Sequence, residues 1–250
     1  MDEELKQKFL EFAEYLEDIR KKIYGILVIF CLCFLVGFFF SGNLLSYLIK
    51  FFNLSNASIV STSPFQFLDL AMSVGLFLAF ICCLPLIVFQ LYNFTKEGLN
   101  KRERRWFLLI LPLSLLLFLV GFSYGFGILY YALDTIAGLN VSLGIQNLWD
   151  IGKFIYEIFL TSVLLGLLFE FPIVLTFFVS VGILDVKFLK TNRRVAMVVM
   201  FVITALLPPT DGVSLVVMVI PMIVIYEVTI IINSWLFKNK KPIVMDVVSI

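Results

Sequence analysis

The feature that most constrains this sequence is the placement of its basic residues along an otherwise apolar chain. Of 19 Lys and Arg residues, 17 lie in four short clusters, and the segments between the clusters are hydrophobic. In membrane proteins, short loops rich in Lys and Arg stay on the cytoplasmic side. Four clusters on one side require an even number of crossings between each neighbouring pair, so the clusters predict the topology. The clusters are Lys6–Lys22, Lys96–Arg105, Lys187–Arg194 and Lys238–Lys241.

The composition excludes an ordinary soluble domain. The 250 residues are 61% hydrophobic and 15% charged, whereas soluble domains are about 45–50% apolar and about 25% charged. The first 22 residues contain seven acids, so they do not resemble a cleavable signal peptide, and we expect the spans themselves to direct insertion.

The chain has no His and only four Cys residues. The missing imidazole removes the commonest general base and metal ligand at neutral pH. The cysteines lie in apolar stretches without CxxC spacing and are predicted to be small buried hydrophobic residues, so we expect no metal and no cofactor. They are Cys31, Cys33, Cys82 and Cys83.

The apolar segments predict six membrane spans, since a helix needs about 20 apolar residues to cross the hydrocarbon core. The last interval, Val195–Phe237, has 43 residues and is interrupted by Pro208-Pro209-Thr210-Asp211-Gly212, which predicts two helices joined by a tight outer turn. We therefore expect an all-α integral membrane protein, one six-span domain over 1–250, with a cytoplasmic N-terminal helix at 1–22 and a cytoplasmic tail at 238–250. The expected spans are 23–40, 68–94, 106–131, 154–179, 195–207 and 213–237.

The fifth expected span is short. Its thirteen residues, Val195–Leu207, rise only about 20 Å, which requires local thinning of the bilayer or a shallow position. Proline residues within the other spans predict kinks; they are Pro85, Pro112, Pro172 and Pro221.

Apolar residues recur at helical spacing before the first span, which predicts an amphipathic helix. Two interpretations stay open: a helix that rests on the membrane surface, or a recognition element packed against the next cytoplasmic loop. The apolar positions are Leu5, Phe9, Phe12, Leu16 and Ile19.

Acidic residues interrupt the first two basic clusters. Glu17 and Asp18 lie in the first cluster, and Glu103 lies in the second. Neighbouring cations favour the ionised form of each carboxyl group. These acids form either a salt-bridged helix surface or fixed acceptors for a guanidinium, which can bind a carboxylate through two parallel hydrogen bonds.

Two further acids, Glu170 and Glu227, lie deep in apolar runs. An ionised side chain at that depth costs at least about 2.5–3.5 kcal/mol. Each acid is therefore a functional candidate that is protonated, paired across helices or exposed to a water-filled cavity. A structural hydrogen bond near Pro172 or Pro221 is the alternative. Asp211, at the outer turn, is explained by capping of the following helix.

Enzyme signatures are missing from the sequence. No Ser/His or Cys/His pair is possible, and neither HExxH nor a Gly-rich phosphate loop occurs. We therefore expect a protein that is not an enzyme.

Several short motifs occur in order along residues 14 to 237. They are Tyr15-Leu16-Glu17-Asp18-Ile19-Arg20-Lys21-Lys22, Ser63-Pro64-Phe65, Pro85-Leu86-Ile87-Val88-Phe89-Gln90 with Phe94, Gly98-Leu99 and Glu103-Arg104-Arg105, Phe169-Glu170-Phe171-Pro172, Pro209-Thr210-Asp211, and Ile220-Pro221-Met222 with Tyr226-Glu227. Together these motifs resemble those of the TatC family, the multispanning receptor of the twin-arginine protein translocase. Tyr15 replaces the family's usual His, and Asp18 replaces a Glu, which shortens that side chain by one methylene.

The resemblance implies a receptor without a covalent step. Members of the family bind the paired arginines of a folded cargo's signal peptide at the cytoplasmic face. Asp18 and Glu103 would be the two acceptors, and Arg20, Phe94, Arg104 and Arg105 would shape the pocket. Glu170, and with it Glu227, would be intramembrane polar groups, Glu170 facing signal-peptide or partner-helix groups on a concave surface. Structural motif positions would be Pro64, Pro85, Gln90, Pro172, Asp211 and Pro221.

The resemblance also implies a cellular location, partner proteins and an energy source. It implies a multi-pass protein of the cell membrane, single-span partners of the TatA and TatB type, self-association in the translocase, and energy from the proton-motive force. No nucleic acid is expected as a partner.

Two other classes are weighed against this one. A secondary transporter or channel would use Glu170 and Glu227 as proton or cation sites near the midplane, but no internal repeat is evident. An intramembrane aspartyl protease would need a dyad at the midplane, whereas Asp18, Asp69 and Asp211 fall at the ends of the spans.

Overall fold

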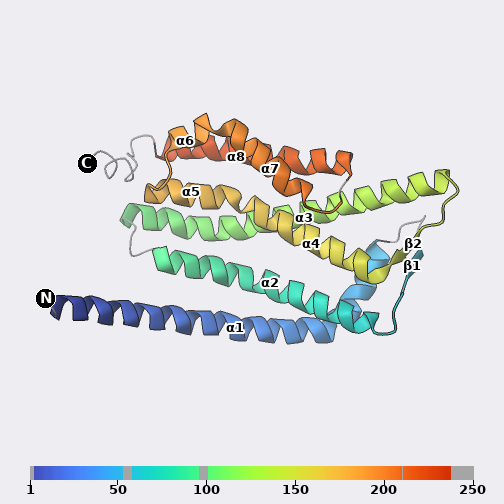
Figure 1. Cartoon of the computed structure of the whole chain (residues 1–250), viewed down its shortest axis with the longest axis horizontal. Helices are drawn as coiled ribbons and strands as arrows, with labels where there is room; N and C mark the ends of the chain where they lie inside the picture. The colour runs from blue at the N-terminus through green and yellow to red at the C-terminus, as the bar shows by residue number, and fades with distance from the viewer. Residues whose placement is uncertain (1–2, 53–57, 96–100, 210, 238–250) are drawn as a thin grey trace.

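The computed structural model of the chain describes residues 3–52, 58–95, 101–209 and 211–237; for residues 3–16, 18–19, 91–95, 101–111 and 181 it describes the backbone alone. Long helices dominate, and two short strands pair between them (Figure 1). The elements are α1 (Glu3–Phe51), β1 (Ser58–Val60), α2 (Gln66–Thr95), α3 (Lys101–Ser142), β2 (Leu148–Asp150), α4 (Ile151–Phe169), α5 (Phe171–Val181), α6 (Val186–Thr191), α7 (Arg193–Ala205) and α8 (Gly212–Leu236).

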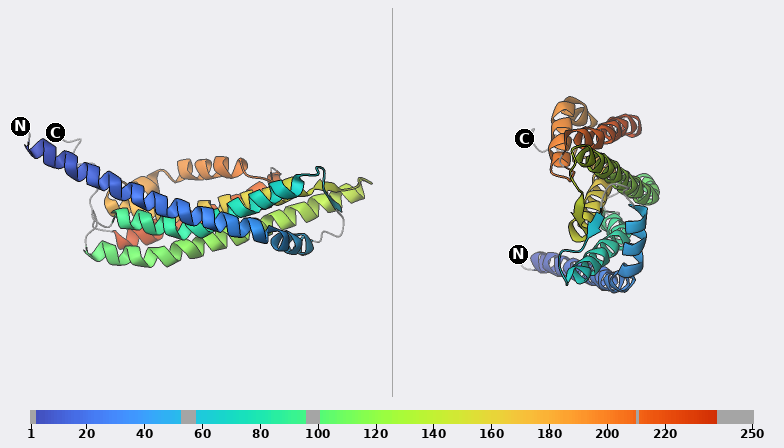
Figure 2. Two further views of the ribbon diagram at one scale, coloured as in Figure 1. Left: turned by 90° about the horizontal axis from the view of Figure 1, so that it is seen from below. Right: turned by 90° about the vertical axis from the view of Figure 1, so that its right-hand side faces the viewer.

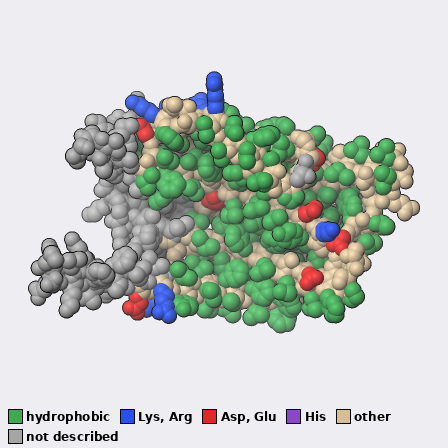
Figure 3. Space-filling view, in the orientation of Figure 1, with side chains coloured by type: hydrophobic (Ala, Val, Ile, Leu, Met, Phe, Trp, Pro, Cys, Tyr) green, Lys and Arg blue, Asp and Glu red, His purple; other side chains and the backbone are tan. Residues whose placement is uncertain are grey.

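The helices run back and forth along one long axis, and the chain turns alternately at its two ends (Figure 1). The start of α1, the end of α2, the start of α3, α6 and the end of α8 lie at one end. The strands and the α7–α8 turn lie at the other. In Figure 3, hydrophobic side chains cover the middle of the visible face, while most of the Lys and Arg side chains lie near one end. The starts of α1 and α3 and the helix α6, which carry described residues of the first three basic clusters, therefore lie at the same end of the molecule.

Five segments are long and apolar enough to cross a membrane among the described residues. The expected fifth span coincides with α7, which has 13 residues and a length of about 20 Å. The mostly helical membrane fold is therefore confirmed. The five segments are Arg20–Phe51, Gln66–Gln90, Pro112–Ser142, Ile151–Ser180 and Gly212–Leu236.

The first helix is longer than the span expected at 23–40. It is unbroken from Glu3 to Phe51, so the amphipathic segment and the first span belong to one helix. Its last turns run in a different direction from the rest (Figure 2). Ser41 and Gly42 form a Ser/Gly pair in this region, which is a known cause of bends, and the Ser41 hydroxyl donates to the Phe38 carbonyl at 2.7 Å. Polarity at Ser41 therefore marks a bend and not the end of the helix.

The turns beyond residue 41 are helical because they pack into a core. Leu45, Leu48 and Phe52 are at most 6% exposed and belong to a buried cluster with residues of α2, α3 and α4. Burial in tertiary contacts thus extends α1 past the span expected at 23–40. The helix α3 also continues to Ser142, beyond the span expected at 106–131.

The expected fourth span, 154–179, consists of two helices. Glu170 is the residue between α4 and α5, with φ −76° and ψ −15°. Pro172 lies in the first turn of α5, where its missing N–H removes no helical hydrogen bond. The predicted kink is therefore a break of the helix at Glu170.

A parallel pair of strands, β1 and β2, joins the α1–α2 loop to the α3–α4 loop. These strands were not expected, because a three-residue strand is too short to show a periodic pattern in the sequence. The pairing aligns Ser58 with Leu148 and Val60 with Asp150. It connects the α1–α2 hairpin to the α3–α4 hairpin at this end of the molecule.

Glycine allows the closest helix contacts. A Cβ atom at Gly121 of α3 would lie 2.7 Å from Cγ of Phe169, and one at Gly125 would lie 2.9 Å from the Cα atom of Ser162 in α4. Spacing of two glycines by four residues is a common device for close packing of membrane helices. A Cβ atom at Gly37 of α1 would lie 3.0 Å from Cα of Gly75 in α2.

The cysteines differ in exposure. All four are free, but only Cys83 is buried, while Cys31 and Cys82 are exposed. The expectation that all are buried inside the protein is therefore wrong. The reason is that an apolar sequence on a membrane helix faces lipid as readily as it faces protein.

Candidate functional site

The first candidate site lies at the end of the molecule where α1 begins, α2 ends and α3 begins (Figure 1). Phe94 lies in the last turn of α2, and Glu103, Arg104 and Arg105 lie in the first turns of α3. Asp18 belongs to the N-terminal half of α1. The side chains of these five residues lie outside the described part of the chain, so the structure gives only the helices that carry them.

Two described side chains next to Asp18 show how this face of α1 is arranged. The Glu17 carboxylate accepts an ion pair from Lys21 at 3.1 Å, one helical turn away. The Arg20 guanidinium lies 5.4 Å from the centre of the Tyr24 ring, a cation–π arrangement. Glu17 and Arg20 therefore both have partners on their own helix.

The second candidate site is Glu170, at the break between α4 and α5. The Ser114 hydroxyl of α3 donates to Oε2 of Glu170 at 2.8 Å. The other carboxylate oxygen, Oε1, is buried and has no hydrogen-bond partner among the described residues. Among the described residues, the Ser114 hydroxyl is therefore the side chain that donates to this carboxyl group.

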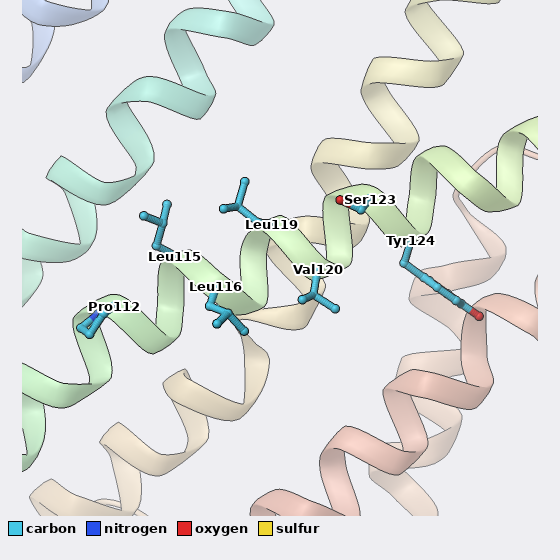
Figure 4. Close-up of a pocket in the computed structure, with 7 residues that line it drawn as sticks. All are labelled: Pro112, Leu115, Leu116, Leu119, Val120, Ser123 and Tyr124. Carbon is cyan, nitrogen blue, oxygen red and sulfur yellow. The ribbon is translucent and has the colours of Figure 1, made fainter. Parts of the chain in front are cut away.

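An open apolar groove of about 610 Å³ runs along residues 112–124 of α3, and its lining includes neither Ser114 nor Glu170. Figure 4 shows its side chains projecting from successive turns, with the Tyr124 ring pointing towards α8. The Tyr124 hydroxyl donates to the Val217 carbonyl of α8 at 2.7 Å. The groove is lined by Pro112, Leu115, Leu116, Leu119, Val120, Ser123 and Tyr124.

Glu227 does not share this site. Its Oε2 lies 3.3 Å from Nη1 of Arg193, at the start of α7, and both side chains are partly exposed. The neighbouring Tyr226 hydroxyl donates to the Leu189 carbonyl of α6 at 2.9 Å. Of the possibilities left open for Glu227, the structure therefore shows pairing across helices, and it does not bring Glu227 together with Glu170.

The motif positions have structural explanations of their own. Asp211 is the N-cap of α8, where its Oδ2 accepts from the Ser214 backbone N–H at 2.8 Å, which confirms the capping expectation. Pro64 lies in the turn that starts α2. Pro85 and Pro221 lie inside continuous helices. Gln90 of α2 has a buried amide nitrogen without a described partner.

A further hydrogen-bonded site, which the sequence did not lead us to expect, is centred on Asp150 at the end of the molecule that holds the strands. This carboxylate accepts from the Thr62 hydroxyl, from the Gln66 amide at 2.8 Å and from the Lys153 backbone N–H at 2.8 Å. The Thr62 hydrogen bond, followed by those from Lys153 and Gln66, lowers the pKa of Asp150 to about 2. We call these residues the outer latch; Asp150 preceding an apolar run was its N-cap signal in the sequence.

Comparison with known proteins places the chain in a family. A family model described as Sec-independent protein translocase protein (TatC) matches residues 14–221. The chain belongs to the TatC family. The match includes the helices that carry Asp18, Phe94 and Glu103 as well as Glu170.

Individual TatC proteins are similar along nearly the whole chain. The TatC protein of Halalkalibacterium halodurans is 27% identical, over 94% of this chain and 93% of its own. TatCy of Bacillus subtilis is 27% identical over 94% and 93%. TatC of Desulforapulum autotrophicum is 30% identical, over 92% of this chain and 86% of its own.

The fold is similar to that of solved TatC structures. A crystal structure of the twin arginine translocase receptor TatC in DDM superposes with a TM-score of 0.76 at 27% identity, covering 87% of this chain and 98% of that chain. These findings confirm the resemblance found in the sequence. This TatC-family chain is thus a membrane component of a Sec-independent protein translocase.

Proposed function

We propose that this chain is the receptor subunit of a twin-arginine translocase, which binds the paired arginines of signal peptides at the cytoplasmic face of the cell membrane. The observation that carries the proposal is the family match over residues 14–221, which includes the Asp18 and Glu103 positions. The fold supports it, because α1 begins, α2 ends and α3 begins at one end of the molecule (Figure 1). In this proposal both termini are cytoplasmic, and α7 is the short fifth of six spans.

The proposed recognition uses two carboxylates, Asp18 and Glu103, as acceptors for two guanidinium groups. Arginine presents a planar fork of donors that a lysine ammonium cannot reproduce, so two fixed carboxylates can prefer Arg-Arg over Lys-Lys. The pairing of Glu17 with Lys21 leaves Asp18 as the acceptor that we assign on α1. Phe94, Arg104 and Arg105, with Arg20, shape and orient the pocket.

We assign the intramembrane contact to Glu170. Its second carboxylate oxygen is buried and unpartnered among the described residues, while the first accepts from the Ser114 hydroxyl of α3. A polar group on a single-span partner of the TatA or TatB type, or on a signal peptide, would complete the carboxylate's hydrogen bonds. Glu227 is engaged by Arg193, so it serves the structure of this chain.

The same ion pair argues against a secondary transporter. Such a protein would need Glu170 and Glu227 as coupled sites near the midplane, whereas Glu227 pairs with a cation that begins α7. The translocase proposal instead takes energy from the proton-motive force through the assembled complex, with its partners and further copies of this chain.

The test is crosslinking of a photoreactive twin-arginine signal peptide to this protein in native membranes, with a twin-lysine peptide as the specificity control. Asp18→Ala and Glu103→Ala should each weaken crosslinking about tenfold or more, because each removes a charge-assisted hydrogen bond. Glu17→Ala is the matched control, because it removes the adjacent acid and should leave crosslinking unchanged. Full crosslinking in the Asp18→Ala/Glu103→Ala double variant would overturn the site assignment.

A further inference from the structure

A group of cations without described partners lies on α6 and at the start of α7. Four basic residues fall within positions 187–194, and Arg193 is paired with Glu227. The other three, Lys187, Lys190 and Arg194, are exposed and form no ion pair with any residue that the structure describes. Basic side chains gather at this edge of the molecule in Figure 3. We call these three residues and the exposed Phe188 the α6 patch.

The α6 patch is held in place by the rest of the fold. Leu189, between Phe188 and Lys190, is 3% exposed and belongs to the core shared by α5, α7 and α8. The Tyr226 hydroxyl of α8 donates to the Leu189 carbonyl at 2.9 Å, and Asp185 caps α6 by accepting from the Lys187 N–H at 3.2 Å. The helix that carries Lys187 and Lys190 is therefore anchored to the rest of the fold.

Two carboxylates belong to the same region, and both are engaged. Asp185 caps α6, and Glu227 pairs with Arg193. Among the residues that the structure describes here, the four cations outnumber these two carboxylates, so their summed charge is positive. An anion that approaches the α6 patch meets two ammonium groups and the planar guanidinium of Arg194, which matches phosphate oxygens in pairs.

Directly along the chain from the cations, α7 presents an exposed apolar stripe. Val195, Val198 and Val202 are 60%, 62% and 52% exposed, and with Val199 they follow the i, i+3, i+4, i+7 spacing of one helix face. Phe188, 55% exposed, adds an aromatic ring beside the lysines. These apolar groups add no binding free energy for a soluble anion, whereas an amphiphile is stabilised both by the cations and by the apolar stripe.

We propose that the α6 patch is a binding site for the headgroup of an anionic phospholipid, with an acyl chain lying along the valine stripe of α7. Basic pockets between helices at the cytoplasmic membrane surface bind such headgroups. Lys187, Lys190 and Arg194 contact the phosphate, and Phe188 lies at the level of the headgroup. This site is separate from the carboxylates proposed to bind signal peptides.

The experiment measures lipid retained by the full chain. The protein is reconstituted with phosphatidylcholine alone or mixed with phosphatidylglycerol, extracted in mild detergent, and examined by native mass spectrometry. Lys187→Gln/Lys190→Gln should weaken retention of phosphatidylglycerol about 30-fold. Each lysine contributes about 1 kcal/mol to binding, and about 1.4 kcal/mol corresponds to a tenfold change in affinity. Lys50→Gln/Lys153→Gln removes the same charge from exposed lysines outside the basic clusters and should leave retention unchanged.

Two results would overturn the proposal. Equal retention of phosphatidylglycerol by the two double variants would show that the lipid binds elsewhere. Thermal stabilisation of the wild-type protein by inorganic phosphate, to the same extent as by phosphatidylglycerol, would show a site for free anions without the apolar half. Melting curves of both variants in phosphatidylcholine serve to confirm that each is folded.

Discussion

Arg193 and Glu227 form an ion pair between the start of α7 and the middle of α8, with 3.3 Å between Nη1 and Oε2. The two helices are antiparallel neighbours (Figure 1), so a residue well inside α8 lies level with the first residue of α7. The short α7 therefore brings a cation to a depth at which Glu227 is otherwise surrounded by apolar residues. This relationship converts an acid of an apolar sequence into one half of an interhelical pair.

The ion pair between Arg193 and Glu227 should make a small contribution to the free energy of unfolding, and replacing either residue should remove it. Both side chains are more than one third exposed, so Arg193→Ala and Glu227→Ala should each lower the free energy of unfolding by about 0.2–1 kcal/mol. Reversal of both charges, Arg193→Glu with Glu227→Arg, should restore most of the loss. Denaturant unfolding in detergent measures these proteins and the Arg193→Ala/Glu227→Ala double variant, which completes the double-mutant cycle, and additive losses in that cycle would show that the pair contributes nothing.

The outer latch predicts a specific pH dependence. The hydrogen bonds from Thr62, Lys153 and Gln66 lower the pKa of Asp150 to about 2 in the folded protein, against about 3.9 in an unfolded chain. The ionised carboxylate therefore stabilises the fold at every pH above about 4, and this contribution is lost as the pH falls through about 2.

Asp150→Asn should accordingly lower the melting temperature by the same amount between about pH 8 and about pH 5, and the difference from wild type should shrink towards pH 2. Asp134→Asn is the matched control, because Asp134 is exposed on the outer half of α3 and has no described hydrogen bond. A difference for Asp150→Asn that grows on acidification would contradict the direction of the pKa shift.

The close contact between α3 and α4 predicts that alanine substitutions at two glycines of α3 have different effects on stability. A Cβ atom at Gly121 would lie 2.7 Å from Cγ of Phe169 and 2.9 Å from the Leu165 carbonyl oxygen, whereas one at Gly127 would meet nothing within 4 Å. Gly121→Ala should therefore destabilise the protein by about 1–3 kcal/mol. Gly127→Ala should cause no loss, and equal effects on thermal unfolding would contradict the close packing.

A substitution at Glu170 should impair transport of cargo without weakening the binding of the signal peptide. Glu170→Gln keeps the size of the side chain and removes the acceptor of its unpartnered oxygen, so crosslinking of the signal peptide should stay intact while export of a twin-arginine reporter falls about tenfold. Ser114→Ala removes one hydrogen bond to Oε2 and should cause a smaller loss. A loss of initial peptide binding in Glu170→Gln would show that its role is misplaced.

Liposomes containing this protein without partner subunits should show no proton flux. Glu170 and Glu227 belong to different sites in the structure, and a receptor alone has no reason to conduct. A pH-sensitive dye inside the vesicles measures the flux, with an added ionophore as the positive control. Flux that disappears in Glu170→Gln would favour the transporter interpretation.

Much of the architecture follows from the sequence because the bilayer imposes it. Apolar length predicts the long helices, and the loops rich in Lys and Arg predict which ends lie together. The capping role of Asp211 also follows from its place before α8. Motif order predicts the TatC family, which the family match over 14–221 confirms. These signals are local in the chain, so a single sequence suffices to detect them.

The tertiary structure alone decided which polar groups meet. That Glu227 faces Arg193, that Ser114 donates to Glu170, and that Asp150 joins both outer loops depends on the rotation and depth of packed helices. The continuation of α1 beyond residue 40 likewise depends on the burial of Leu45, Leu48 and Phe52 against other helices. Hydropathy indicates where a segment crosses a membrane, because the free energy of transfer into lipid is a sum over separate residues. It does not indicate which side chains of different helices meet, because those contacts arise only when the helices pack together.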